Sequence, residues 1–125
     1  MIDHPKLARL RLDLDLKRAE LRGFSDLYAT AAGQATAHAA EIAGSPFVDM
    51  TAAELAAVQI DWHQANSPYG IAESNRRAQL DAARVYRAAR DRADELQRRI
   101  EVLRVEVDPL ARLVDRLTSY VARKA

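Results

Sequence analysis

The three histidines, His4, His38 and His63, are the first residues to consider for metal or acid–base chemistry. A metal site on a helix needs His and carboxylate ligands at a recognised spacing, commonly three or four residues apart. None of the three stands in such a pattern, and His38 falls on an apolar stripe where a partly buried structural histidine is the simpler interpretation. We therefore predict no metal and no other cofactor.

The tetrapeptide Asp61-Trp62-His63-Gln64 contains the only Trp of the chain. It could form a recognition or catalytic cluster, but we favour a structural role in which Trp62 anchors a short helix. The chain has no Cys, no Gly-rich phosphate loop, no nucleophile elbow and no Glu-x-x-His pair. These absences predict that the protein is not an enzyme and has no small-molecule ligand.

Arginines are frequent along one segment of the second half of the chain. They are Arg76, Arg77, Arg84, Arg87, Arg90, Arg92, Arg98, Arg99 and Arg104. Acidic residues are interleaved, and Asp94–Arg98 and Glu95–Arg99 have the favourable helical i, i+4 order, which is typical of a solvated coiled-coil flank. Residues 76–92 are less balanced, so the alternative function is nucleic-acid association through Arg76, Arg77, Arg84 and Arg87.

The composition predicts an all-α protein with a single domain over residues 1–125. Hydrophobic residues make up 49% and charged residues 30% of the 125 residues, while 4 Gly and 4 Pro leave few helix breakers. The net charge of +1 is unevenly distributed, because residues 23–72 contain acidic side chains but no Lys or Arg.

The N-terminal residues 1–20 carry charges throughout and lack the apolar core of a signal peptide. No run of 18 uncharged apolar residues occurs, so we expect no membrane partner. The expected location is the cytoplasm or a particle assembled there.

A heptad stripe over the last third of the chain dominates the pattern. Its spacings of four and three residues are typical of a helix that buries a narrow seam against another helix. The stripe contains Ala82, Tyr86, Ala89, Ala93, Leu96, Ile100, Leu103, Val107, Leu110, Val114, Leu117 and Val121.

A similar stripe predicts a first helix over residues 3–43, with Asp3 as the N-cap and Pro5 in the first turn. Gly44-Ser45-Pro46 marks its end. Gly23 and Gly33 lie inside this helix, where a close approach of another helix would explain them. The stripe contains Leu7, Leu10, Leu14, Lys17, Leu21, Phe24, Tyr28, Ala31, Ala35, His38 and Ile42.

Residues 44–72, here called the tip, follow the first helix. Thr51 and Glu54 form a capping box that predicts a short helix from Thr51 to about Asn66. The tip has acidic charges only, so it is a candidate docking point for a basic partner. Its candidate recognition residues are Phe47, Trp62 and Tyr69.

The two stripes pair best as an antiparallel two-helix coiled-coil hairpin. The first helix is Leu-rich at its start and Ala-rich at its end, and the long helix over residues 73–108 has the opposite order. Pairing positions that sum to about 114 places Leu7 by Val107 and Leu14 by Ile100.

Residues 109–123 then form a C-terminal helical extension, kinked near Pro109, with no partner left in the hairpin. Either this extension folds back at Pro109, or it continues as a helix and is buried in an oligomer. Leu12 and Leu16, with Val102 and Val105, form a second apolar face. The predicted protein interface consists of Leu12, Leu16, Val102, Val105, Leu110, Leu113, Val114, Leu117 and Val121.

These features predict a non-enzymatic structural or adaptor protein. It would self-associate, with a dimer as the first expectation, or bind a helical protein partner. In architecture alone it looks like the small stalk, chaperone and assembly proteins of phage particles and bacterial secretion systems.

Leu14→Asp or Ile100→Asp is expected to unfold the helix pair, because each places an unpaired charge in the seam. Circular dichroism during heating measures this loss. Full helicity and cooperative melting in both variants would contradict the pairing.

Overall fold

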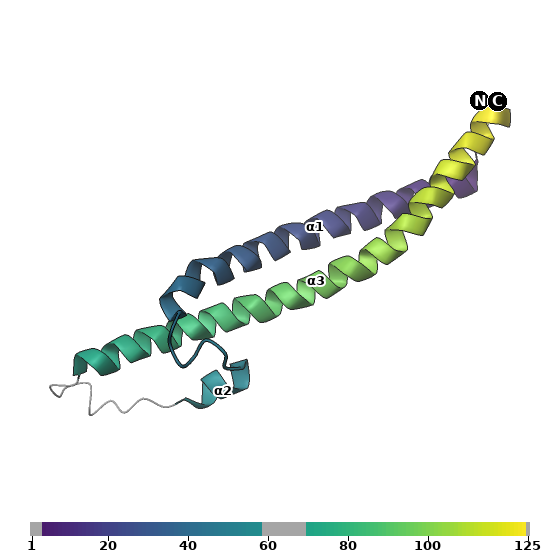
Figure 1. Cartoon of the computed structure of the whole chain (residues 1–125). Helices are drawn as coiled ribbons and strands as arrows, with labels where there is room; N and C mark the ends of the chain where they lie inside the picture. Colours follow the sequence, from purple (N-terminus) through teal and green to yellow (C-terminus); the bar gives the residue numbers. More distant parts are fainter. Residues whose placement is uncertain (1–3, 59–69, 125) are drawn as a thin grey trace. The chain divides into compact units, whose positions relative to one another are not determined.

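The protein is all-α over the residues that a computed structural model describes, which are 4–58 and 70–124, with side chains from Asn75 onward in the second range. Helix α1 spans Pro5–Ile42, α2 spans Ala52–Ala57 and α3 spans Gly70–Lys124 (Figure 1). The all-α part of the predicted fold class is confirmed, and α1 packs against α3.

The chain divides into two compact units. Unit 1 contains the described residues of Met1–Tyr28 and Glu95–Ala125, and unit 2 contains those of Ala29–Asp94. Both long helices contribute a segment to each unit, so each unit is described separately below.

In unit 1 the two helix segments run antiparallel. Arg11 donates a hydrogen bond to the Thr118 hydroxyl at 3.0 Å, and the Lys17 ammonium lies 3.2 Å from Glu106. Residue numbers rise along α1 as they fall along α3. The buried cluster between the segments contains Leu7, Leu14, Val107 and Val114.

The register differs from the sequence prediction by about one heptad. Lys17 meets Glu106 and Phe24 meets Arg99, so contacting positions sum to about 123 and not to 114. Leu14 accordingly shares a cluster with Val107 and Val114 that does not include Ile100. A slip of seven residues matches one heptad stripe to the other equally well, so the heptad pattern alone does not distinguish the two registers.

This register corrects the prediction that the C-terminal segment has no partner within the chain. Val114 is buried against α1, and Leu110, Leu117 and Val121 pack at the edge of the same cluster. These residues are therefore core of unit 1, and Leu113 beside them is half-buried.

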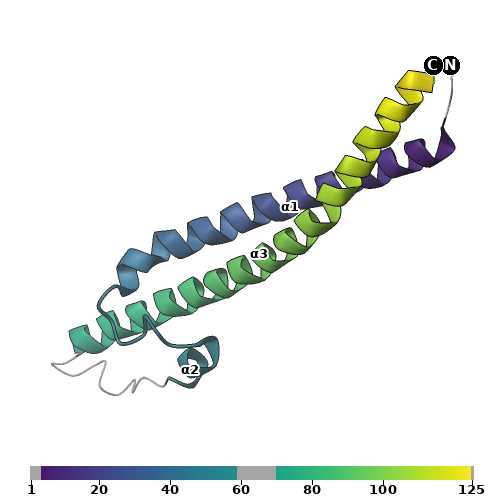
Figure 2. The ribbon, with the colours of Figure 1, turned by 45° about the vertical axis from the view of Figure 1, so that its right-hand side comes forward.

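Helix α3 continues through Pro109 without a break (Figure 2). The sequence leaves two paths open for residues 109–123, a fold-back at Pro109 or a continuing helix. The fold-back is wrong. The unbroken heptad phase across Pro109 already favours a continuous helix, because a loop would not need to preserve it.

The ends of α1 follow local rules. His4 is the N-cap: its carbonyl accepts from Ala8 at 3.1 Å, and its Nδ1 accepts from the Leu7 amide at 3.1 Å. The predicted cap, Asp3, lies outside the described residues. Gly44 has φ +77°, which confirms the glycine stop after Ile42.

Unit 2 has its own core, where the end of α1, the tip and the start of α3 meet. Buried residues of all three segments share one cluster: Ile42, Phe47, Leu55, Leu80, Ala82 and Ala83. The capping box is confirmed by reciprocal hydrogen bonds between Thr51 and Glu54. Helix α2 is shorter than predicted, because its backbone is already extended at Val58.

Gly23 and Gly33 have no close neighbour that would explain them. A Cβ added at either position meets nothing within 4 Å. The expectation of a close helix approach is therefore wrong.

Gly23→Ala and Gly33→Ala should each raise the free energy of unfolding by about 1 kcal/mol, because Ala is the better helix former. Gly44→Ala should lower it by about 1–2 kcal/mol, since a Cβ is strained at positive φ. Urea titrations of the three variants measure these effects. A Gly33→Ala variant that is less stable than the unaltered chain would contradict this prediction, because it would indicate a close contact at position 33 that the structure lacks.

Candidate interaction surface

The four most exposed large apolar side chains in the described part of unit 1 are each at least 60% exposed. Leu12 and Leu16 on α1 are 62% and 61% exposed, and Val102 and Val105 on α3 are 60% and 74% exposed. We call these the outer faces. The sequence predicts the same four residues as an exposed apolar face, because they fall outside the a and d positions of the seam.

The register places the two outer faces at a similar level of unit 1. Lys17 contacts Glu106, so Leu16 and Val105, the residues just before them, are also near the same level. Each helix thus has an apolar seam inside and a second apolar face outside, a pattern found in helices that belong to larger bundles.

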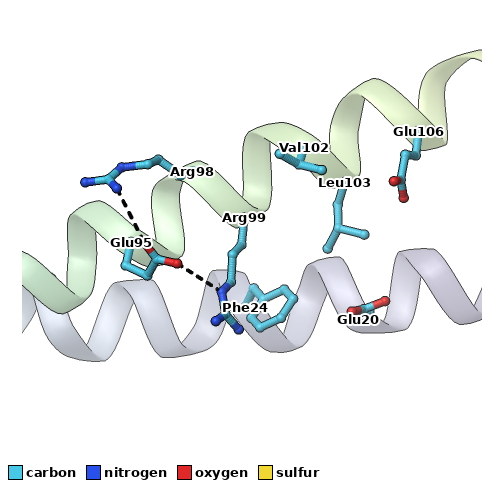
Figure 3. Close-up of a pocket in the computed structure, with 8 residues that line it drawn as sticks. All are labelled: Glu20, Phe24, Glu95, Arg98, Arg99, Val102, Leu103 and Glu106. Carbon is cyan, nitrogen blue, oxygen red and sulfur yellow. Dashed lines mark hydrogen bonds and ion pairs between the residues drawn. The ribbon is translucent and has the colours of Figure 1, made fainter.

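A groove lies between α1 and α3 in unit 1, with a volume of about 460 Å³. Phe24 of α1 and Leu103 and Val102 of α3 line it, with Leu103 pointing toward α1 (Figure 3). The other lining residues are Glu20, Glu95, Arg98, Arg99 and Glu106.

Most charges around the groove are already paired within the chain. Glu95 lies 3.4 Å from both Arg98 and Arg99, and the Arg99 guanidinium stacks over the Phe24 ring at 5.7 Å (Figure 3). The hydrogen bond and charge of Glu106 raise the pKa of Lys17 above its ordinary value. The groove therefore combines an apolar floor with a nearly neutral rim.

The arginines of the alternative nucleic-acid face make contacts within the chain. Arg76 lies over the Phe47 ring at 5.9 Å, Arg77 is 3.9 Å from Asp81, and Arg87 is 3.7 Å from Asp91. These contacts direct three of the four side chains to neighbours within unit 2.

Arg84 has the most specific contacts of the four. Its Nε and Nη2 both donate to the Leu55 carbonyl, at 3.2 and 3.0 Å, and Nη2 also donates to the Val58 carbonyl at 3.5 Å. Both carbonyls lie at the C-terminal end of α2, where few helical donors remain; that of Leu55 also accepts from the Val58 amide at 3.4 Å. Arg84 thus fastens α2 to α3, a role that sequence reasoning missed because α2 and Arg84 are far apart in the chain.

Of the three candidate recognition residues of the tip, one belongs to the core and two lie outside the described residues. Phe47 is 2% exposed and belongs to the core of unit 2, so its assignment to tip recognition is corrected. Trp62 and Tyr69 lie in residues 59–69, outside the described residues, as does His63.

Among the residues whose side chains are described, 4–58 and 75–124, no group of three or more His, Asp or Glu is placed to hold a metal ion. His38 contacts Glu41 at 3.3 Å. Over their described residues, neither long helix has a segment that is long and apolar enough to cross a membrane.

Over residues 4–58 and 70–124 the fold is all-α, with two long helices and one short helix, and its highly exposed large apolar side chains lie on the long helices. Comparison of the chain with protein-family models, curated proteins and solved structures finds no match.

Arg84→Lys should loosen α2 and speed amide hydrogen exchange in residues 45–58, because one ammonium cannot replace the two-pronged contact to Leu55. We expect a local loss of about 1 kcal/mol. Arg90→Lys is the matched control, since Arg90 is exposed on the same helix. Equal rates of amide hydrogen exchange in the two variants would show that Arg84 does not hold α2 against α3.

Proposed function

We propose that the protein is a non-enzymatic structural or adaptor protein that associates with a second copy of itself through the outer faces. The observation that supports this is the exposure of Leu12, Leu16, Val102 and Val105 on two packed helices of one unit. Exposed apolar residues grouped on a monomer are typical of interaction surfaces.

The residue types at these positions support the same proposal. Valine on an exposed helix surface lowers helix propensity by up to about 0.7 kcal/mol relative to Ala. Val102 and Val105 make no contribution to either buried cluster that would offset this cost. Burial against another helix is a physical reason for valine there.

A second copy is favoured as the partner because the charges near the outer faces are balanced. Lys17 pairs with Glu106, and Arg98 and Arg99 pair with Glu95, so two copies would approach without strong repulsion. A two-fold symmetric contact would bring the same face of each copy together. The simplest result is a four-helix bundle formed by unit 1 of each copy.

The wider role is the assembly of a larger particle or machine, such as a phage particle or a bacterial secretion system, and the expected location is the cytoplasm. A different helical protein is the other possible occupant of the outer faces. Nucleic-acid binding through residues 76–92 has weaker support, because Arg76, Arg84 and Arg87 contact other parts of unit 2.

Light scattering on a sizing column should give at least twice the 13.9 kDa mass of the chain. The double variant Leu16→Gln/Val105→Gln should run as a monomer with unchanged helicity, because both side chains are exposed and outside the seam. The measurement is the absolute mass over a hundredfold range of protein concentration.

Leu27→Gln/Val85→Gln is the matched control. It also removes one Leu and one Val, both exposed but away from the outer faces, and should keep the mass of the unaltered chain. A monomeric unaltered chain at every concentration, or equal effects in the two variants, would contradict the proposal.

A further inference from the structure

Antiparallel packing gathers positive charge at one end of unit 1. The first turns of α1 supply Lys6, Arg9 and Arg11, and the last turns of α3 supply Arg112, Arg116, Arg123 and Lys124. Both views show these two helix ends beside each other, and the Arg11–Thr118 hydrogen bond joins them (Figures 1 and 2). All seven side chains are exposed. We call this region the basic end.

Acidic residues are scarce at the basic end. Residues 4–13 and 110–124 include only Asp13 and Asp115 as carboxylates. The seven cations therefore create a local excess of positive charge in a chain whose formal net charge is only +1. A charge concentrated in this way attracts an anionic partner to one place on the molecule.

None of these seven cations forms an ion pair with a carboxylate of the described residues, whereas Lys17, Arg98 and Arg99 do so further along the same helices. Their observed partners are neutral. Arg112 donates to the Asp108 carbonyl, Arg123 to the Ser119 carbonyl, and the Lys124 ammonium lies over the Tyr120 ring. These contacts orient the side chains without neutralising them.

We propose that the basic end binds the phosphate backbone of nucleic acid. Five of the seven cations are arginines, whose planar guanidinium groups bind phosphate oxygens through two parallel hydrogen bonds. Exposed cations on two adjacent helix ends offer several phosphate contacts at once and no sequence selection. This inference uses different residues from the proposed self-association and does not depend on it.

A lipid surface fits the same charges less well. Stable membrane binding needs apolar side chains that insert beside the cations. Here Leu7 is buried, and Leu10, Leu117 and Val121 pack in the seam between the helices, which leaves only Leu12 and Tyr120 as highly exposed large apolar groups among the described residues of the basic end.

Fluorescence anisotropy with a labelled 20-base-pair duplex tests the proposal on the full chain. If four phosphates are neutralised, affinity should fall on the order of a hundredfold between 50 and 200 mM salt. The triple variant Arg9→Gln/Arg112→Gln/Arg116→Gln should bind at least about tenfold more weakly and lower the salt slope by about 3.

Arg90→Gln/Arg92→Gln/Arg104→Gln removes the same charge from exposed positions outside the basic end, and its affinity should stay within about twofold of the unaltered chain. No duplex binding at 50 mM salt, or equal weakening in both triple variants, would overturn the proposal. Binding to phosphatidylserine vesicles without binding to the duplex would assign the basic end to lipid and also overturn it.

Discussion

The antiparallel seam between α1 and α3 in unit 1 is the constraint on which the rest of this unit depends. Leu7, Leu14, Val107 and Val114 bury their side chains there, and Lys17 reaches Glu106 at its edge. An isolated helix is only marginally stable in water, so packing of this stripe provides most of the stability of both segments. The register of the seam then decides which residues remain outside.

The heptad pattern and the register together set two surfaces. The apolar stripe of residues 110–121 packs on the start of α1, so the outer-face residues, which lie outside the seam in either register, remain the most exposed large apolar side chains in the described part of unit 1. The same packing places the first turns of α1 beside the last turns of α3, and so assembles the basic end. A register one heptad earlier would leave residues 110–124 beyond α1 and disperse those cations.

The parts of the fold that depend on neighbouring residues could be predicted from the sequence. Gly44 ends α1 at positive φ, and the Thr51–Glu54 box starts α2, because a few adjacent residues supply each signal. The choice of helix over strand and the antiparallel pairing follow from the heptad stripes and from the opposite order of Leu-rich and Ala-rich segments. The four residues of the outer faces could be selected because they break that heptad pattern.

The remaining features depend on contacts between distant segments. Shifting one stripe by seven residues matches apolar positions equally well, so the register was mispredicted and residues 110–121 were assigned to an interface. The Arg84 contact to the end of α2 and the burial of Phe47 depend on how the tip folds back, which no local pattern encodes. The basic end could not be predicted either, because it depends on the first turns of α1 lying beside the last turns of α3.

The register of α1 against α3 in unit 1 can be measured directly, and both surfaces described above are interpreted with it. Arg18 follows Arg11 by one heptad, and Gln97 and Arg104 precede Thr118 by whole heptads, so all three lie on the flank where Arg11 meets Thr118. The chain has no Cys, so Cys introduced at 18 and 104, or at 18 and 97, provides the only two sites for spin labels in each variant. Excess unlabelled chain ensures that each measured distance lies within one molecule. Double electron–electron resonance should give the shorter distance for 18/104, and a shorter distance for 18/97 would contradict the account.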